Sequence, residues 1–354
     1  MLLRMALTFA GLCGALTLVA ACQAESTQLA YVTPLNAGHS ATPPADTPVP
    51  TANLATWTAT ASPTSSATAT SSATPSITPT DIGTPLARET SAPTWTPPAL
   101  TPARLDDHYV LERPIAAGAI NWVDRTYPYG STAGNRFPLH HGVEFVNSRH
   151  TEVLATASGS VYFAGDDSVR QFGPSTRYYG NLVVLQHDGQ TPQGRALFTL
   201  YAHLESLDVA TGERLSAGDV LGQVGDSGIA SGPHLHFEVR VGDPNSYATT
   251  RNPELWLRPF RGFGTLAGRV RDWAGNLLQE VTISVRSTDL LRYAWSYAGD
   301  SVNGDDGFGE NLVLGDLPAN YYEVTVGERG RILFRKTIYI WPGRTNWLEI
   351  QLPA

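Results

Sequence analysis

The pattern of hydrophobic and polar positions changes along this chain, and each stretch predicts a different kind of structure. Residues 5–21 are predominantly apolar and follow one positive charge at Arg4. Residues 23–105 are mostly Thr, Ser, Ala and Pro and show no hydrophobic periodicity. From residue 106 onward, short apolar runs are separated by Gly, Asp and Asn, which is the pattern of β-strands joined by turns.

Residues 106–260 are predicted to form a compact, mostly antiparallel β domain. Six apolar runs have the length and composition of strands, and no long helical stripe lies among them. The predicted strands span residues 153–155, 159–164, 181–187, 196–202, 220–224 and 234–240.

Residues 264–354 follow a Gly-rich joint at residues 261–264, and their pattern predicts a small β-sandwich. Apolar and polar positions alternate in five runs, at residues 265–271, 281–285, 322–326, 332–340 and 347–352. The predicted fold class is therefore all-β, with a peptide tether before the two domains. Residues 22–105 form that tether and are expected to be disordered, because they hold too little apolar surface to offset the cost of ordering the chain.

The N-terminal residues resemble a bacterial lipoprotein signal. The apolar run ends in Val19-Ala20-Ala21-Cys22, and small residues before a cysteine are typical of a processing site. The resemblance implies a signal peptide over residues 1–21, cleavage before Cys22, lipidation of its thiol and a membrane anchor for an extracytoplasmic protein. An uncleaved signal anchor is the alternative, and it also places the rest of the chain outside the cytoplasm.

Composition and charge exclude several classes of function. The 354 residues include 24 basic and 32 acidic side chains, and Lys336 is the only lysine, so we expect no nucleic-acid partner. The two cysteines, Cys13 and Cys22, cannot build a disulfide framework or a four-thiolate zinc site. Both belong to the signal and its processing site, so cysteine catalysis is excluded as well.

Histidines are concentrated in the middle domain, where seven of the nine lie between His140 and His236. His234 and His236 are two residues apart on a predicted strand, so their side chains point to one face. By the same parity His140 and Glu144 converge if that piece is extended. Imidazoles with a carboxylate suit a zinc ion that keeps one coordination position open for water.

Each of these signals taken alone has a plain structural alternative. His203 lies in an apolar strand and would ordinarily be read as a core histidine, and His141 and His187 have better structural readings still. The acidic run at residues 303–306 lacks the spacing of a calcium loop and is interpreted as a turn.

Taken in order, the motifs of residues 136–242 resemble the lysostaphin-type (LytM-like) zinc metallopeptidases, which cleave peptidoglycan. The runs that carry the resemblance are Gly180-Asn-Leu-Val-Val184, Leu200-Tyr-Ala-His-Leu204, Gly218-Asp-Val-Leu-Gly-Gln-Val-Gly-Asp-Ser-Gly228 and Ser231-Gly-Pro-His-Leu-His-Phe-Glu-Val-Arg240. The resemblance implies that His140, Glu144 and His236 bind zinc and that His203 and His234 are catalytic. Asn181 matches a polar position near the groove and receives no role.

Two further observations shape the functional expectation. The family's first motif ends in Asp, whereas this chain has Glu144, so a weak or inactive scaffold that binds cell wall or activates a partner amidase is the alternative to a peptidoglycan endopeptidase. A purely adhesive sandwich protein would leave the histidines unexplained.

The C-terminal part resembles the carboxypeptidase regulatory-like (transthyretin-like) sandwich through Gly268-Arg-Val-Arg-Asp-Trp-Ala-Gly275, Asp306-Gly-Phe308 and Leu317-Pro-Ala-Asn-Tyr-Tyr-Glu-Val324.

Overall fold

The structure, a computed structural model, describes residues 107–353. The predicted signal, the tether and Cys22 lie outside this range. The described residues are almost entirely β-structure with two short 3-10 helices, η1 (Tyr247–Thr249) and η2 (Pro253–Leu255), which confirms the predicted all-β fold class. Within this range no helix has the length and apolar character needed to cross a membrane.

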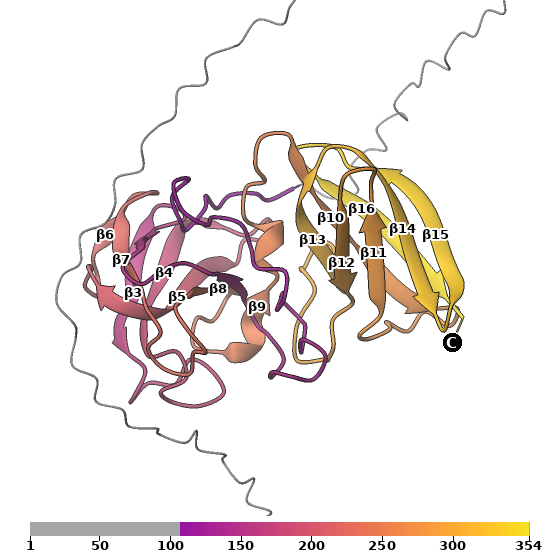
Figure 1. The fold of residues 1–354 in the computed structure, drawn as a ribbon. Coiled ribbons are helices and arrows are strands. Elements are labelled where there is room, and N and C mark those ends of the chain that lie inside the picture. Colours follow the sequence, from indigo (N-terminus) through magenta and orange to yellow (C-terminus); the bar gives the residue numbers. More distant parts are fainter. Residues whose placement is uncertain (1–106, 354) are drawn as a thin grey trace, which may run out of the picture. The chain divides into compact units, whose positions relative to one another are not determined.

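The first nine strands form one antiparallel sheet (Figure 1). Its main path runs β1-β8-β5-β4-β3-β6, while β2 and β5 flank β7 and β9 pairs with β8. The strands are β1 (Val143–Phe145), β2 (Glu152–Leu154), β3 (Gly159–Asp166), β4 (Asn181–Gln190), β5 (Ala196–Leu207), β6 (Arg214–Leu215), β7 (Val220–Val224), β8 (Leu235–Val241) and β9 (Thr250–Arg251).

The last seven strands form two sheets, which we call the C-terminal sheets. Their orders are β13-β10-β16 and β12-β11-β14-β15, and only the β10/β16 pair is parallel. Apolar side chains of both sheets fill one common core. The strands are β10 (Phe263–Asp272), β11 (Thr282–Arg286), β12 (Leu291–Trp295), β13 (Leu312–Pro318), β14 (Tyr321–Glu328), β15 (Arg331–Tyr339) and β16 (Thr345–Leu352).

The strands predicted from the sequence coincide with most of the observed ones, but two strands of the C-terminal sheets were not predicted. β12 has an exposed first half, so it offers no clear alternation of apolar and polar positions. β13 contains Gly315, Asp316 and Pro318, which are residues typical of turns. Its pairing with β10, rather than its own sequence, defines it as a strand.

The central strand β8 explains how the fold places polar groups together. Leu235, Phe237 and Val239 point to one face and join the core of the first sheet. The alternate positions carry polar side chains and are nevertheless buried: His234, His236, Glu238 and Arg240. A buried polar face on a central strand requires internal hydrogen bonds, and these form the site described below.

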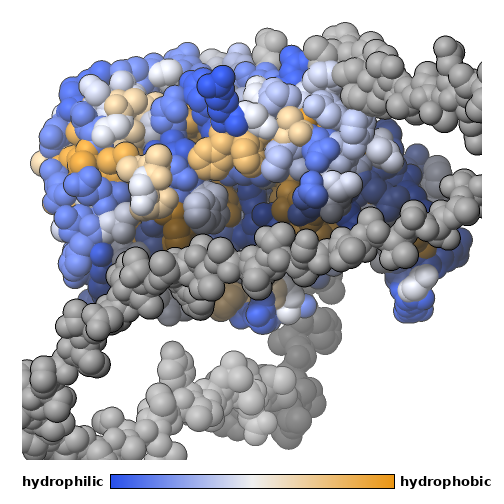
Figure 2. All heavy atoms as spheres, turned by 45° about the horizontal axis from the view of Figure 1, so that its top comes forward, coloured by the Kyte–Doolittle hydropathy of each residue, from blue (hydrophilic) through white to orange (hydrophobic). Residues whose placement is uncertain are grey.

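The first sheet and the C-terminal sheets share apolar contacts. One core cluster contains residues of η2 and β8 together with residues that follow the joint at 261–264. Those contributed by the C-terminal part are Ala267, Tyr297, Val302, Phe308 and Val313. The predicted domain boundaries, 106–260 and 264–354, stay a prediction. On the outer surface, apolar residues form separate patches among hydrophilic ones (Figure 2).

Candidate metal centre and groove

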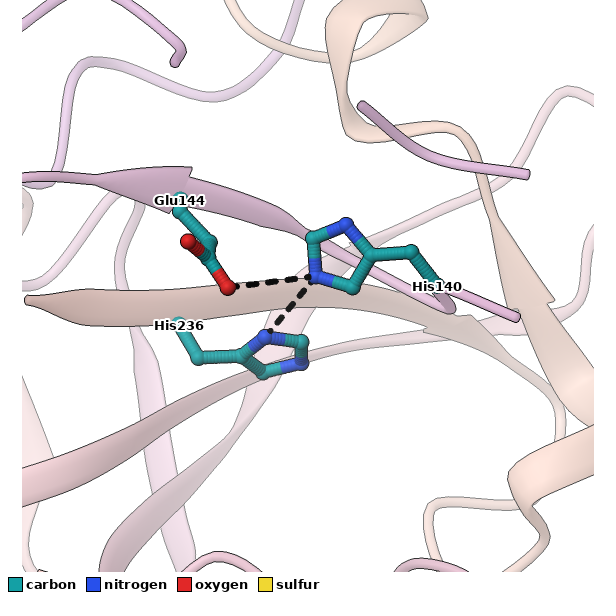
Figure 3. Close-up of side chains that lie close together, drawn as sticks. All are labelled: His140, Glu144 and His236. Atoms are coloured by element: carbon teal, nitrogen blue, oxygen red, sulfur yellow. Dashed lines mark hydrogen bonds and ion pairs between the residues drawn. The ribbon is translucent and has the colours of Figure 1, made fainter. Parts of the chain in front are cut away.

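The three residues predicted to bind zinc lie together. Glu144 in β1 pairs directly with His236 in β8, so their side chains share a face, and His140 reaches the same point from the loop before β1. One nitrogen or oxygen of each side chain lies within 4.8 Å of the others (Figure 3). His140 is outside any strand, so the predicted parity with Glu144 is not what brings it there.

Hydrogen bonds to the two imidazoles fix which nitrogen faces the centre. His140 Nδ1 lies 2.7 Å from the carbonyl oxygen of Tyr127, and His236 Nε2 lies 3.0 Å from Glu238 Oε1. Both partners only accept, so we assign the N–H to these two nitrogens. His140 Nε2 and His236 Nδ1 then present bare lone pairs to each other at 3.2 Å. Two lone pairs and the Glu144 carboxylate around one point suit a bound cation, and this donor set fits Zn²⁺.

Burial and neighbouring charges set the ionisation of this centre. Burial, and next the adjacent His236, hold the pKa of His140 well below its usual range, so its ring is neutral and free to coordinate. Burial raises the pKa of Glu238, but Arg240 and His236 outweigh that effect and leave it lowered. Glu238 therefore stays an anion. Arg240 Nε donates to it at 2.7 Å, and the Tyr179 hydroxyl donates to its other oxygen.

The two predicted catalytic histidines face each other beside this centre. The ring centroids of His203 and His234 are 4.8 Å apart. Each Nδ1 lies 2.8 Å from a backbone carbonyl, of Ser227 and Gly232 respectively, so each Nε2 is left to exchange protons. His234 Nε2 lies 3.5 Å from Glu144 Oε1. Burial, and next the neighbouring His236 and His234, lower the pKa of His203 to about 3.

A bulge in β5 turns His203 toward the site. Ala202 pairs with His236, so a regular strand would send the next side chain, His203, to the opposite face. Instead His203 has φ 62, and the pairing of β5 with β4 shifts by one residue at this point. A bulge re-aims a side chain in this way, which explains why a residue of an apolar strand joins a polar site.

Asn181, to which the sequence assigned no role, braces that bulge. Its side-chain amide donates to the Leu204 carbonyl, and so does the Ser227 hydroxyl at 2.8 Å. The Asn181 backbone N–H donates in turn to the Ser227 hydroxyl. The same Ser227 holds the His203 ring through its carbonyl, so these contacts fix the ring's orientation.

An open groove of about 620 Å³ runs past the metal centre. All five predicted site residues line it. Its walls are largely apolar or aromatic and come from the segments on either side of β1, the loop before β4 and the loop before β8. The residues are Tyr127, Phe137, Pro138, Val146, Tyr178 and Ile229. The site is therefore accessible to an extended polymer.

The remaining candidate residues are structural. His141 is buried, stacks on Tyr247 at 3.9 Å and contacts Thr250, and His187 contacts Thr199 at 2.9 Å. In the acidic run at 303–306, Asp306 forms ion pairs with Arg195 and Arg251. These side chains are engaged by the protein itself, in agreement with the interpretation of the run as a turn.

Sequence reasoning missed Glu238, Arg240 and Tyr127. The signal for the first two was present, because His234, His236, Glu238 and Arg240 alternate with apolar residues on a strand that reads as buried. Four polar residues on one buried face imply a connected network. Tyr127, whose ring stacks on His140 at 4.0 Å and 4°, carries no comparable signal.

Residues 138–249, which include all five site residues, match the model of Peptidase family M23. The chain is 37% identical over 103 residues to the DD-carboxypeptidase/endopeptidase Mpg of Neisseria meningitidis, covering 29% of this chain and 20% of that protein. It is 32% identical over 106 residues to the peptidoglycan DD-endopeptidase ShyA of Vibrio cholerae, covering 30% and 21%. The solved catalytic domain of the antimicrobial peptidase lysostaphin from Staphylococcus simulans is 29% identical, with a TM-score of 0.29 over 37% of this chain and 86% of that chain. The chain thus spans about a fifth of the length of these two curated relatives, and its match to the M23 peptidase family is confined to residues 138–249.

Proposed function

We propose that the M23-type domain of this chain is a zinc metalloendopeptidase that hydrolyses peptide bonds in peptidoglycan cross-bridges or stem peptides. The observation that carries the proposal is the convergence of His140, Glu144 and His236 beside the His203/His234 pair in an open groove. The M23 match over the same residues and the names of its relatives support the reaction and the substrate class.

The chain's own residues divide the chemistry between them. Zinc, when bound by His140, Glu144 and His236, supplies Lewis acidity to the scissile carbonyl and to water. His203 and His234 are oriented by carbonyls at Nδ1, so each presents Nε2 to the groove for proton exchange. Because the pKa of His203 is lowered, its ring is neutral at pH 7, so Nε2 carries a lone pair rather than a proton.

The proposal includes the location of the protein. Lipidation at Cys22 would hold the chain on the outer side of a cell membrane, and the Pro-rich residues 22–105 would let the domain reach the wall. Radiolabelled fatty acid incorporation by the wild-type chain, with none by Cys22→Ala, tests this part independently of activity.

The test of the activity uses cross-linked peptidoglycan and the full chain loaded with zinc. We expect about one zinc per chain and new peptide ends that a His234→Ala variant does not produce. Because this variant keeps the three proposed metal ligands, its loss of activity would not be caused by loss of zinc. A variant as active as the wild type would contradict the catalytic role of His234.

Glu144 gives the alternative its specific support, since the related motif has Asp at this position. Zinc binding without turnover on any wall type would favour a wall-binding or amidase-activating scaffold. Glu144→Asp then tests the cause, because recovered turnover would place the defect in the longer side chain.

A further inference from the structure

The metal ligand His140 is held by a segment outside the sheet that carries the other ligands. Its N–H donates to the carbonyl of Ser131 at 3.0 Å, and its carbonyl accepts from Gly130 at 2.8 Å. Its ring is stacked on Tyr127 and bonded to the carbonyl of that residue. Residues 127–131 therefore fix both the backbone and the ring of His140.

The loop that follows β12 in the C-terminal sheets in turn holds this segment. The Ala298 N–H donates to the Gly130 carbonyl at 2.7 Å, and the Tyr297 ring lies directly against Gly130. A Cβ on Gly130 would come within 2.4 Å of Tyr297 Cδ1, so glycine is required for this approach, and its φ of 74 is also one that glycine favours.

A second attachment lies one residue earlier. The Tyr129 hydroxyl donates to the Thr250 carbonyl at 3.1 Å and contacts the backbone of Asn303 at 3.1 and 3.2 Å. Tyr129 and Tyr297 also pack edge to face, with ring centroids 5.2 Å apart. Buried aromatic and hydrogen-bonded contacts of this kind leave the segment little freedom.

We propose that the C-terminal sheets position His140 for metal binding through Tyr297 and Ala298. This inference rests on the proposed metal site but assigns a new role to the C-terminal part, as a support for one ligand. Tyr297 is a positioning residue, because it acts on the site only through residues 129–131. Contacts that orient a ligand typically change metal affinity by about 10- to 100-fold when lost.

The test measures zinc affinity of the full chain against a chromophoric chelator. Tyr297→Leu removes the ring beneath Gly130, together with the hydroxyl that bonds Asn252 and Glu310, and we expect it to weaken zinc binding about tenfold. Val324→Ala is the matched control, because it creates a cavity in the core shared by the C-terminal sheets without touching the segment. It should lower stability and leave zinc affinity unchanged.

Two more variants keep the inference falsifiable if Tyr297→Leu does not fold. Tyr129→Phe removes only the hydroxyl contacts and should weaken zinc binding a few-fold. Gly130→Ala should weaken zinc binding strongly, because its Cβ clashes with the Tyr297 ring. The Gly130→Ala/Tyr297→Leu double variant should lose less zinc affinity than the sum of the losses in the two single variants, because the clash is relieved. Equal affinities for Tyr129→Phe, Tyr297→Leu and wild type would overturn the inference, whereas a wild type without zinc would overturn the proposed function as well.

Discussion

At the scale of single residues, Glu238 is the most informative side chain outside the five predicted ones. It is fully buried, accepts from His236 Nε2 and pairs with the equally buried Arg240. Its carboxylate accepts the N–H of His236 Nε2 and so fixes Nδ1 as the nitrogen that faces the candidate metal site. The carboxylate and the ligand are joined on one strand face, two residues apart.

We predict that Glu238→Gln lowers zinc affinity by about 10- to 100-fold while His236 stays in place. The glutamine retains a hydrogen-bond acceptor but loses the charge, so Arg240 is left less well compensated and stability falls by about 3 kcal/mol. Chelator competition and chemical denaturation measure the two effects. Unchanged zinc affinity would show that the carboxylate only balances Arg240.

A second residue-scale prediction concerns Glu310, which is buried and bonded to Tyr297 and to the backbone of Asp305. Burial raises the pKa of Glu310 to about 8, although backbone hydrogen bonds, that from the Asp305 N–H first, act in the opposite direction. A carboxyl whose pKa is raised on folding stabilises the fold fully below its unfolded pKa, and this stabilisation is lost as the pH rises to about 8.

We therefore expect Glu310→Gln to gain stability relative to the wild type between about pH 4.5 and 8, by up to about 5 kcal/mol. Denaturation midpoints of both proteins across that range give the difference, in which the other titrating groups cancel. A difference independent of pH would mean that Glu310 ionises normally in the fold.

At the scale of elements, the bulge in β5 and the loop after β7 form one unit. Gly180 and Gly228 both have positive φ and lie against each other. A Cβ on Gly228 would come within 2.4 Å of the Gly180 backbone nitrogen, so only backbone movement could relieve the clash. That movement would displace Ser227, whose carbonyl holds the His203 ring.

Gly228→Ala is predicted to reduce turnover at least tenfold with a smaller change in zinc affinity, because it disturbs His203 but no metal ligand. Gly218→Ala is the matched control, since Gly218 has φ 90 and open space around its Cβ position. It carries a similar backbone strain of about 1 kcal/mol and should keep full turnover. Equal losses in both variants would show a general effect on stability.

The sequence predicted the strands well where apolar and polar positions alternate regularly. It predicted them poorly where pairing with a neighbouring strand determines the structure. The alternation in β8 indicated its two faces, and the five residues predicted for the site all line one groove. The position of His203 could not be derived from alternation, because a bulge reverses its face. β13 could not be found, because its turn-forming residues become a strand only through pairing with β10.

At the scale of the whole molecule, the first sheet and the C-terminal sheets are joined by polar as well as apolar contacts. Arg125 forms an ion pair with Glu254 and donates to the Gly315 carbonyl at 2.9 Å. Arg113 Nη1 donates to Asp316 Oδ2 at 3.0 Å. Gly315 and Asp316 lie across the predicted boundary at 260–264 from the two arginines, and nothing in either stretch of sequence indicated that they meet.

We predict that residues 106–260 do not fold stably without residues 264–354. Removal would expose apolar side chains of the shared core and leave the buried Glu254 with fewer partners. Circular dichroism and size-exclusion chromatography of the two fragments, separately and mixed, measure this. A folded, monomeric 106–260 fragment with wild-type zinc affinity would contradict it.

The contacts of Gly130 also limit which chimeras of this chain with a related protein would keep the candidate site intact. A crossover at the joint of residues 261–264 would bring a foreign partner against Gly130 and Tyr129, with no tyrosine shaped to receive them. A chimera that exchanges residues 125–139 together with the C-terminal sheets would keep the matching surfaces. The unit to exchange when engineering this protein is therefore discontinuous in sequence, because the part of the groove wall at residues 126–138 has to be exchanged together with the C-terminal sheets.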